Sequence, residues 1–122
     1  MRLFDMKNLL RAEEALMFLA TVFLVYQLPV PGWLYWVLFI APDLSMLGYI
    51  VNAKVGAIAY NLVHHKGIAV AIYLVGLYLN NTELLFTGLL LFGHSSFDRL
   101  CGYGLKYPDN FKNTHLGLIG KS

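Results

Sequence analysis

The stretch from Trp33 to Val51 reads WLYWVLFIAPDLSMLGYIV, and its one charged residue is Asp43. About 20 apolar residues in a helix cross the hydrocarbon core of a bilayer, so this run is long enough to span a membrane. Pro42 removes a backbone hydrogen bond near the middle of the run and is expected to bend the helix there. The stretch therefore predicts a bent membrane-spanning helix with a carboxylate at the bend.

Apolar runs of similar length flank this stretch on both sides. Together they predict four spans, at about 9–28, 33–51, 55–79 and 83–101, followed by a tail at 102–122. The breakers between them lie at 29–32, 52–54 and 80–82, and connections this short force neighbouring helices to run antiparallel. We expect an all-α membrane protein whose residues 1–122 form a single domain, a four-helix up-and-down transmembrane bundle with a short polar C-terminal tail.

The composition agrees with membrane residence. Of the 122 residues, 58% are hydrophobic and 13% are charged, against about 25% charged in ordinary soluble domains, and the mean hydropathy is +0.60. A formal charge of +2 without a basic stripe argues against a nucleic-acid partner. The expected partner is therefore the lipid bilayer, and a homo-oligomer is expected if so short a chain has to form a transport pathway.

Basic residues set the expected orientation, since Lys and Arg are retained on the cytoplasmic side. They lie before the first span, in the loop at 52–54, and at the end of the fourth span and in the tail: Arg2, Lys7, Arg11, Lys54, Arg99, Lys106, Lys112 and Lys121. The other two loops contain none. We therefore expect a multi-pass protein of the cell membrane with both termini in the cytoplasm, and an outer aromatic belt at Trp33, Tyr35 and Trp36.

Ionisable residues interrupt the spans at similar depths. Measured from the cytoplasmic end of its helix, Asp43 lies about 12 Å deep, His64 about 15 Å and His94 about 10 Å. Asp98 is shallower and follows His94 by four residues, so the two share a helical face. Tyr60 or Asn61 forms a similar set with His64. Intramembrane ionisable groups are costly and are functional candidates by default.

These positions define a candidate site on the cytoplasmic side of the bundle. Asp43, His64, His94 and Asp98 are the expected catalytic or metal-ligating residues, and Glu14, Asn61, Ser95 and Arg99 are expected to bind a ligand around them. A different interpretation is that Asp43, His64 and His94 form a hydrogen-bond network that holds the bundle, at about 0.6 kcal/mol per bond. Asp98 can also pair with Arg99 or Lys106, and His115 is expected to be a surface histidine.

Several motifs resemble a known family. They are Ala41–Tyr49, Tyr60–His64, Gly93–Arg99 with Gly102–Tyr107, Phe111–Lys112 and Thr114–Gly117. They are similar to the small bacterial membrane proteins catalogued as domain of unknown function 4260, and the likeness covers nearly the whole chain. The resemblance implies an integral protein of the bacterial inner membrane and no particular activity. Because it includes the tail, it also implies that residues 102–120 fold back over the site.

Two classes of function remain open. In the first, the chain is a metal-dependent membrane hydrolase, in which two His and one or two carboxylates hold zinc or another divalent metal and one position is left for an activated water. In the second, it is a non-enzymatic binding, proton-relay or transport scaffold, in which the same groups titrate without doing chemistry. Metal analysis of the purified protein distinguishes the two classes.

Overall fold

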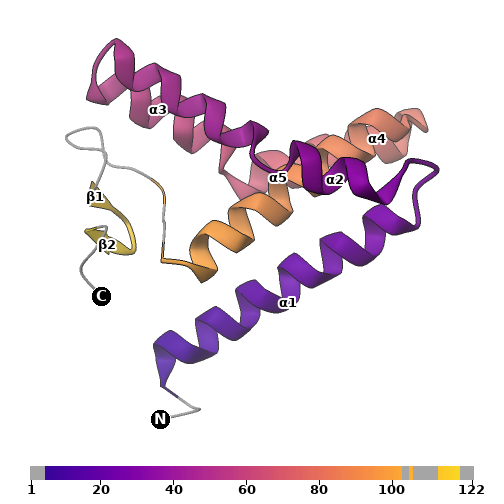
Figure 1. Ribbon diagram of the computed structural model, residues 1–122, viewed down its shortest axis with the longest axis horizontal. Helices are drawn as coiled ribbons and strands as arrows, with labels where there is room; N and C mark the ends of the chain where they lie inside the picture. Colours follow the sequence, from indigo (N-terminus) through magenta and orange to yellow (C-terminus); the bar gives the residue numbers. More distant parts are fainter. Residues whose placement is uncertain (1–4, 103–104, 106–112, 119–122) are drawn as a thin grey trace.

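The computed structural model of the chain describes residues 5–102, 105 and 113–118. These residues hold five α-helices, one 3₁₀ helix and a small antiparallel hairpin (Figure 1). In chain order the elements are α1 (Met6–Tyr26), α2 (Gly32–Leu38), the 3₁₀ helix η1 (Ala41–Ile50), α3 (Ala53–Val63), α4 (Lys66–Leu79), α5 (Thr82–Leu100), β1 (Asn113–Thr114) and β2 (Gly117–Leu118). The predicted all-α class is confirmed, and the hairpin lies in the region predicted as a polar tail.

The predicted span at 33–51 consists of two helices of different kinds. Pro42 has no N–H to donate to the carbonyl of Leu38, so the α-helix cannot continue past this point. The N–H of Asp43 instead donates to the carbonyl of Ile40, three residues back, at 3.0 Å, which is the spacing of a 3₁₀ helix. The expected bend at Pro42 is therefore a change from α to 3₁₀ winding.

The predicted span at 55–79 is also divided. α3 ends at Val63 and α4 begins at Lys66, with an angle of 43° between them. The ring of His65 accepts a hydrogen bond from the N–H of Ile68 at 3.2 Å, so His65 acts as the N-cap of α4. The sequence His65-Lys66-Gly67 therefore starts a new helix in the middle of the predicted span.

α5 lies at the centre of the molecule. It packs against α4 and α1, while α3 packs against η1 and diverges from α1 (Figure 1). Two glycines permit the close approach of α5 to its neighbours. A Cβ at Gly88 would lie 2.8 Å from the carbonyl oxygen of Ala69, and a Cβ at Gly93 would overlap the hydroxyls of Tyr35 and Thr21.

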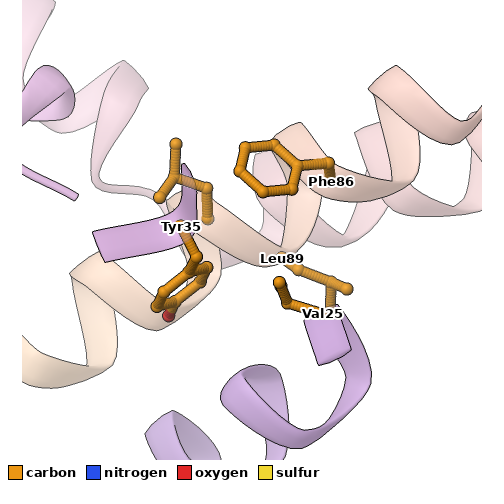
Figure 2. Close-up of a cluster of buried hydrophobic side chains, with 5 residues drawn as sticks. Val25, Tyr35, Phe86 and Leu89 are labelled. Carbon is orange, nitrogen blue, oxygen red and sulfur yellow. The ribbon is translucent and has the colours of Figure 1, made fainter. Parts of the chain in front are cut away.

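The buried apolar core is formed by α1, α2 and α5. Phe86 and Leu89 of α5 point toward Tyr35 of α2 and Val25 of α1 (Figure 2). The hydroxyls of Tyr35 and Thr21 lie 2.9 Å apart and share a hydrogen bond, which satisfies the polar end of a fully buried tyrosine. Tyr35 is therefore a core residue, and its expected place in an outer aromatic belt is wrong.

The four-span transmembrane bundle is not what the described helices show. Gly32–Ile50 is long and apolar enough to cross a membrane, and α3 with α4 qualifies as a second span if the bent pair is counted as one. The predicted spans at 9–28 and 83–101 correspond to α1 and α5, and charged residues such as Glu14 and Asp98 lower the apolar character of these two helices. One or two candidate spans therefore replace the four expected from the sequence.

Candidate metal centre

Four ionisable side chains from three parts of the chain meet in one cluster. Asp43 comes from the first turn of η1, His64 is the C-cap that follows α3, and His94 and Asp98 come from successive turns of α5. One nitrogen or oxygen of each side chain lies within 4.8 Å of those of the other three. The structure thus brings together the four residues that depth and helical spacing predict as a site.

Backbone carbonyls fix the orientation of both histidines. Nδ1 of His64 lies 2.9 Å from the carbonyl oxygen of Tyr60, and Nδ1 of His94 lies 2.6 Å from that of Phe39. A carbonyl only accepts hydrogen bonds, so Nδ1 is the protonated nitrogen in each ring. In a neutral imidazole Nε2 then carries a lone pair, and the Nε2 atoms of both rings face the carboxylates.

The carbonyl of Phe39 is free to hold His94 because of Pro42. In a continuous α-helix the Phe39 oxygen would accept from the N–H of Asp43, four residues on. Since that N–H donates to Ile40 instead, the Phe39 oxygen remains for the imidazole. The helix break encoded at Pro42 therefore provides both the exposed turn that carries Asp43 and the acceptor that orients His94.

The four nitrogen–carboxylate distances within the cluster lie near the edge length of a tetrahedron around a metal ion. Nε2 of His94 lies 3.0 Å from Oδ1 of Asp43 and 3.5 Å from Oδ2 of Asp98. For Nε2 of His64 the corresponding distances are 3.7 Å and 3.3 Å. Ligands about 2.0–2.2 Å from a tetrahedral ion lie about 3.3–3.6 Å from one another. The nitrogen–carboxylate distances are therefore close to those between two ligands of one cation, and all four atoms lie within 4.8 Å of one another.

Electrostatics favour a cation at the same place. When both rings are neutral, the Nε2 lone pair of each histidine faces the two carboxylates in a largely buried space, where the side chains of His64 and His94 are 3% and 4% exposed. Nε2 of His64 makes no hydrogen bond within the described part of the chain. A buried polar atom without a partner is costly, and a cation among the four atoms removes that cost.

Asp43 is the accessible side of the cluster. Its side chain is 42% exposed, whereas that of Asp98 is 15% exposed. Three of the four groups are therefore enclosed by protein, and water or a small molecule can reach the cluster beside the Asp43 carboxylate.

Tyr60 supports the cluster from α3 and was not among the site residues expected from the sequence. Its hydroxyl donates to Oδ2 of Asp98 at 3.1 Å, and its ring stacks on that of His64 with centroids 3.8 Å apart. Its carbonyl also orients the His64 ring. In the sequence, Tyr60 lies four residues before His64 and Asn61 lies three residues before it. Either spacing places a residue on the helical face of His64, so the sequence did not distinguish Tyr60 from Asn61.

The residues predicted to surround the cluster lie in different settings. Nη2 of Arg99 reaches the carbonyl oxygen of His64 at 3.5 Å, which places the guanidinium next to the cluster. The hydroxyl of Ser95 donates to the carbonyl of Leu91 in its own helix at 2.8 Å. Asn61 is partly buried on α3, one residue from Tyr60.

Glu14 forms an ion pair with Lys66 at the start of α4. Both side chains are mostly shielded from water, and the pair joins the first helix to the fourth across the face of α5. Lys66 therefore has a partner in α1, and Glu14 contributes to this pair rather than to the Asp/His cluster.

His115 lies in the turn between β1 and β2. Its Nδ1 accepts a hydrogen bond from the N–H of Leu105 at 2.8 Å, and the residue as a whole is exposed, as expected of a surface histidine. Partial burial of the imidazole, followed by the nearby charge of Arg99, lowers the pKa of His115.

Comparison with known proteins gives one match. Residues 7–119 match the sequence family described as Domain of unknown function (DUF4260), which confirms the resemblance carried by the motifs. No curated protein and no solved structure matches the chain. The function must therefore be inferred from the geometry of the cluster.

Proposed function

The chain belongs to the DUF4260 family, and we propose that it is a membrane protein that holds one divalent metal ion between Asp43, His64, His94 and Asp98. The observation that carries this proposal is the meeting of two nitrogens and two oxygens within 4.8 Å, with Nδ1 of each histidine held by a backbone carbonyl. Metal-ligating histidines almost always donate their other ring N–H to a carbonyl or carboxylate in this way.

Zinc is the metal that best suits the donor set. Imidazole nitrogens and carboxylate oxygens are both zinc ligands, and zinc favours tetrahedral coordination. Magnesium and calcium prefer octahedral or larger oxygen shells, which two imidazoles do not provide. Iron(II) and manganese(II) remain competitors, because imidazole and carboxylate also bind these ions.

We further propose that the site is hydrolytic. A catalytic zinc keeps three protein ligands and leaves the fourth position to water or substrate. Asp43 is the ligand that can yield this position, because it is the most exposed of the four. Metal-assisted hydrolysis would then use His64, His94 and Asp98 as fixed ligands, with Asp43 positioned to accept a proton from the water.

A second candidate function rests on one contact. Nε2 of His94 and Oδ1 of Asp43 lie 3.0 Å apart in hydrogen-bond geometry, which is what a proton relay requires if His94 is protonated on both nitrogens. In that case the four residues pass a proton along their hydrogen bonds and the chain is a relay or transport scaffold. The two functions differ in whether the protein holds a metal.

Metal analysis tests the first function directly. Protein purified in mild detergent with a tag that lacks histidine is expected to contain about one zinc or other divalent ion per chain. The measurement is elemental analysis by mass spectrometry, repeated after incubation with zinc, iron(II) and manganese(II). Folded protein that takes up less than about 0.1 ion per chain under all these conditions would overturn the metal proposal and favour the relay.

Removal of the Tyr60 hydroxyl is expected to weaken metal binding by about 10- to 100-fold without unfolding the chain. Tyr60→Phe keeps the ring that stacks on His64 but loses the hydrogen bond to Asp98, and such supporting contacts have effects of this size. The measurement is zinc competition with a chelator of known affinity. Tyr78→Phe is the matched control, since Tyr78 is exposed on α4; equal affinities of the two variants would contradict this role.

Membrane residence is supported by the outer surface of the helices. Large apolar side chains are exposed along several elements, including Phe23 on α1, Ile50 on η1 and Leu74 on α4. Monomeric soluble proteins rarely expose extensive apolar patches. Only 11% of the most apolar window of Gly32–Ile50 is buried inside the fold, so most of this segment is free to contact lipid, which is the proposed partner.

The proposed topology places both termini in the cytoplasm, because basic residues flank the corresponding ends of the helices. Reporters that are active only in the cytoplasm, fused in separate experiments before Met1 and after Ser122, are therefore expected to be active. A periplasmic reporter at the same positions serves as the control. Periplasmic activity at both ends would place the Asp/His cluster in the opposite leaflet.

A further inference from the structure

An apolar cavity lies between α1, α4 and α5, apart from the Asp/His cluster, and it is open to the surface beside the exposed Leu24 and Val70. Its volume is about 280 Å³, and its walls include Met17, Ala20, Leu24, Val70, Leu89 and Phe92. None of the four clustered residues lines it. The hydroxyl of Thr21, which also borders it, is already hydrogen-bonded to the carbonyl of Phe18. The walls therefore offer hydrocarbon contact and few polar partners.

The size and shape of the cavity suit one alkyl chain. An apolar cavity of about 150 Å³ stays dry and binds benzene, so a volume nearly twice as large accommodates about ten to twelve carbons. The α1 residues on its wall, from Met17 to Leu24, extend over about 10 Å of helix. The cavity therefore follows about two turns of α1.

A cation lies at one end of this space. Nζ of Lys66 is 3.8 Å from Sδ of Met17 and 5.4 Å from the ring centroid of Phe92, and both residues line the cavity. The ammonium has three donors. One is used by Glu14, and the thioether of Met17 is a weak acceptor, so Lys66 retains the capacity to bind a further strong acceptor.

We propose that this cavity binds a fatty acid of about ten to twelve carbons, with its chain along α1 and its carboxylate on Lys66. The walls match the hydrocarbon chain and the ammonium matches the anionic head. The charged end lies toward the N-terminus of α1, where the basic residues place the cytoplasmic boundary, and the apolar end extends toward Leu24. This arrangement matches the orientation of an amphiphile in a membrane. The proposal does not depend on metal binding.

The test uses the full chain in nanodiscs of dioleoylphosphatidylcholine. The probe is dodecanoic acid with a photoreactive diazirine at the end of its chain, and crosslinked peptides are mapped by mass spectrometry. Labelling is expected on the peptides that hold Leu24 and Leu89, at the end of the cavity away from Lys66, and unlabelled dodecanoic acid is expected to compete. Dodecanol has the same chain without the carboxylate and is expected to compete at least about tenfold less well, since a charge-assisted hydrogen bond is worth about 1.5–3 kcal/mol.

Paired variants distinguish binding in the cavity from binding to the lipid-facing surface in general. Ala20→Phe fills the cavity and is expected to reduce labelling at least about fivefold, whereas Ala71→Phe, on the exposed face of α4 outside the cavity, is expected to leave it unchanged. Leu24→Trp provides a second test at the other end of the cavity, where it should shift the preference to shorter fatty acids. Labelling spread over η1 and insensitive to both cavity variants would overturn the proposal, since no residue of η1 lines the cavity.

Charge variants test the head group. Lys66→Gln is expected to weaken competition by dodecanoic acid and to bring it close to that of dodecanol. Glu14→Gln removes the carboxylate that now shares Lys66, so it is expected to strengthen binding of the acid. If dodecanoic acid and dodecanol compete equally in the unmodified chain, the assignment of a carboxylate head is wrong.

Discussion

Replacement of His94 by alanine is expected to lower zinc affinity by at least about 100-fold, because it removes one of the four ligand atoms of the Asp/His cluster. Loss of a contact that only supports a ligand already lowers metal affinity by about 10- to 100-fold. Among the four residues, His94 is the best oriented. Its two ring nitrogens contact Phe39 and Asp43 at 2.6 and 3.0 Å. The measurement is zinc competition with a chelator of known affinity, on protein purified without a histidine tag.

His115→Ala is the matched control for this experiment. It removes the same side chain from the turn of the tail hairpin, which contributes none of the clustered groups. Its zinc affinity is expected to equal that of the unmodified chain. If the two alanine variants bind zinc equally well while both remain folded, the cluster is not the metal site.

Introduction of a methyl group at Gly93 is expected to lower the free energy of unfolding by about 1–3 kcal/mol, which is the usual cost of overfilling a close-packed core. The added Cβ would overlap the hydroxyls of Tyr35 and Thr21, both of which are buried. Because Gly93 precedes His94, the displacement of α5 would also disturb the histidine. The measurement is unfolding of Gly93→Ala in mixed detergent micelles as the denaturing detergent is increased.

A double variant identifies the cause of this loss. Tyr35→Phe removes the hydroxyl that the new methyl group would meet, at the cost of its hydrogen bond to Thr21. Gly93→Ala combined with Tyr35→Phe is therefore expected to be more stable than the sum of the two single effects predicts. Strict additivity would show that the methyl group and the hydroxyl do not compete for the same space.

The cluster could be predicted because local rules govern most of it. Depth along each apolar run placed Asp43, His64 and His94 at comparable levels, and the four-residue spacing put Asp98 on the face of His94. Pro42 also predicted an interruption of the helix beside Asp43. These inferences need only the sequence of each segment and the antiparallel order of the segments.

The supporting residues and the number of spans depend on contacts between distant segments. Spacing alone could not decide between Tyr60 and Asn61, because the rotation of α3 is set by its packing on η1, where Gly56 lies against the ring of Tyr49. Nor could spacing show that Lys66 begins a helix and pairs with Glu14, 52 residues away. The fatty-acid cavity depends on the same long-range packing.

The ten-residue 3₁₀ winding of η1 sorts its side chains into straight rows. With three residues per turn, side chains three apart eclipse one another. One row is exposed and aliphatic: Leu44, Leu47 and Ile50. The next row, which begins with Asp43 and continues through Met46 and Tyr49, is only partly exposed. Wound as an α-helix, Leu44 and Ile50 would point about 120° apart. A conversion of η1 to α winding would therefore break this row of aliphatic side chains and turn Asp43 relative to it. One change of helical pitch would then alter both the apolar surface that η1 presents to lipid and the direction of the Asp43 carboxylate.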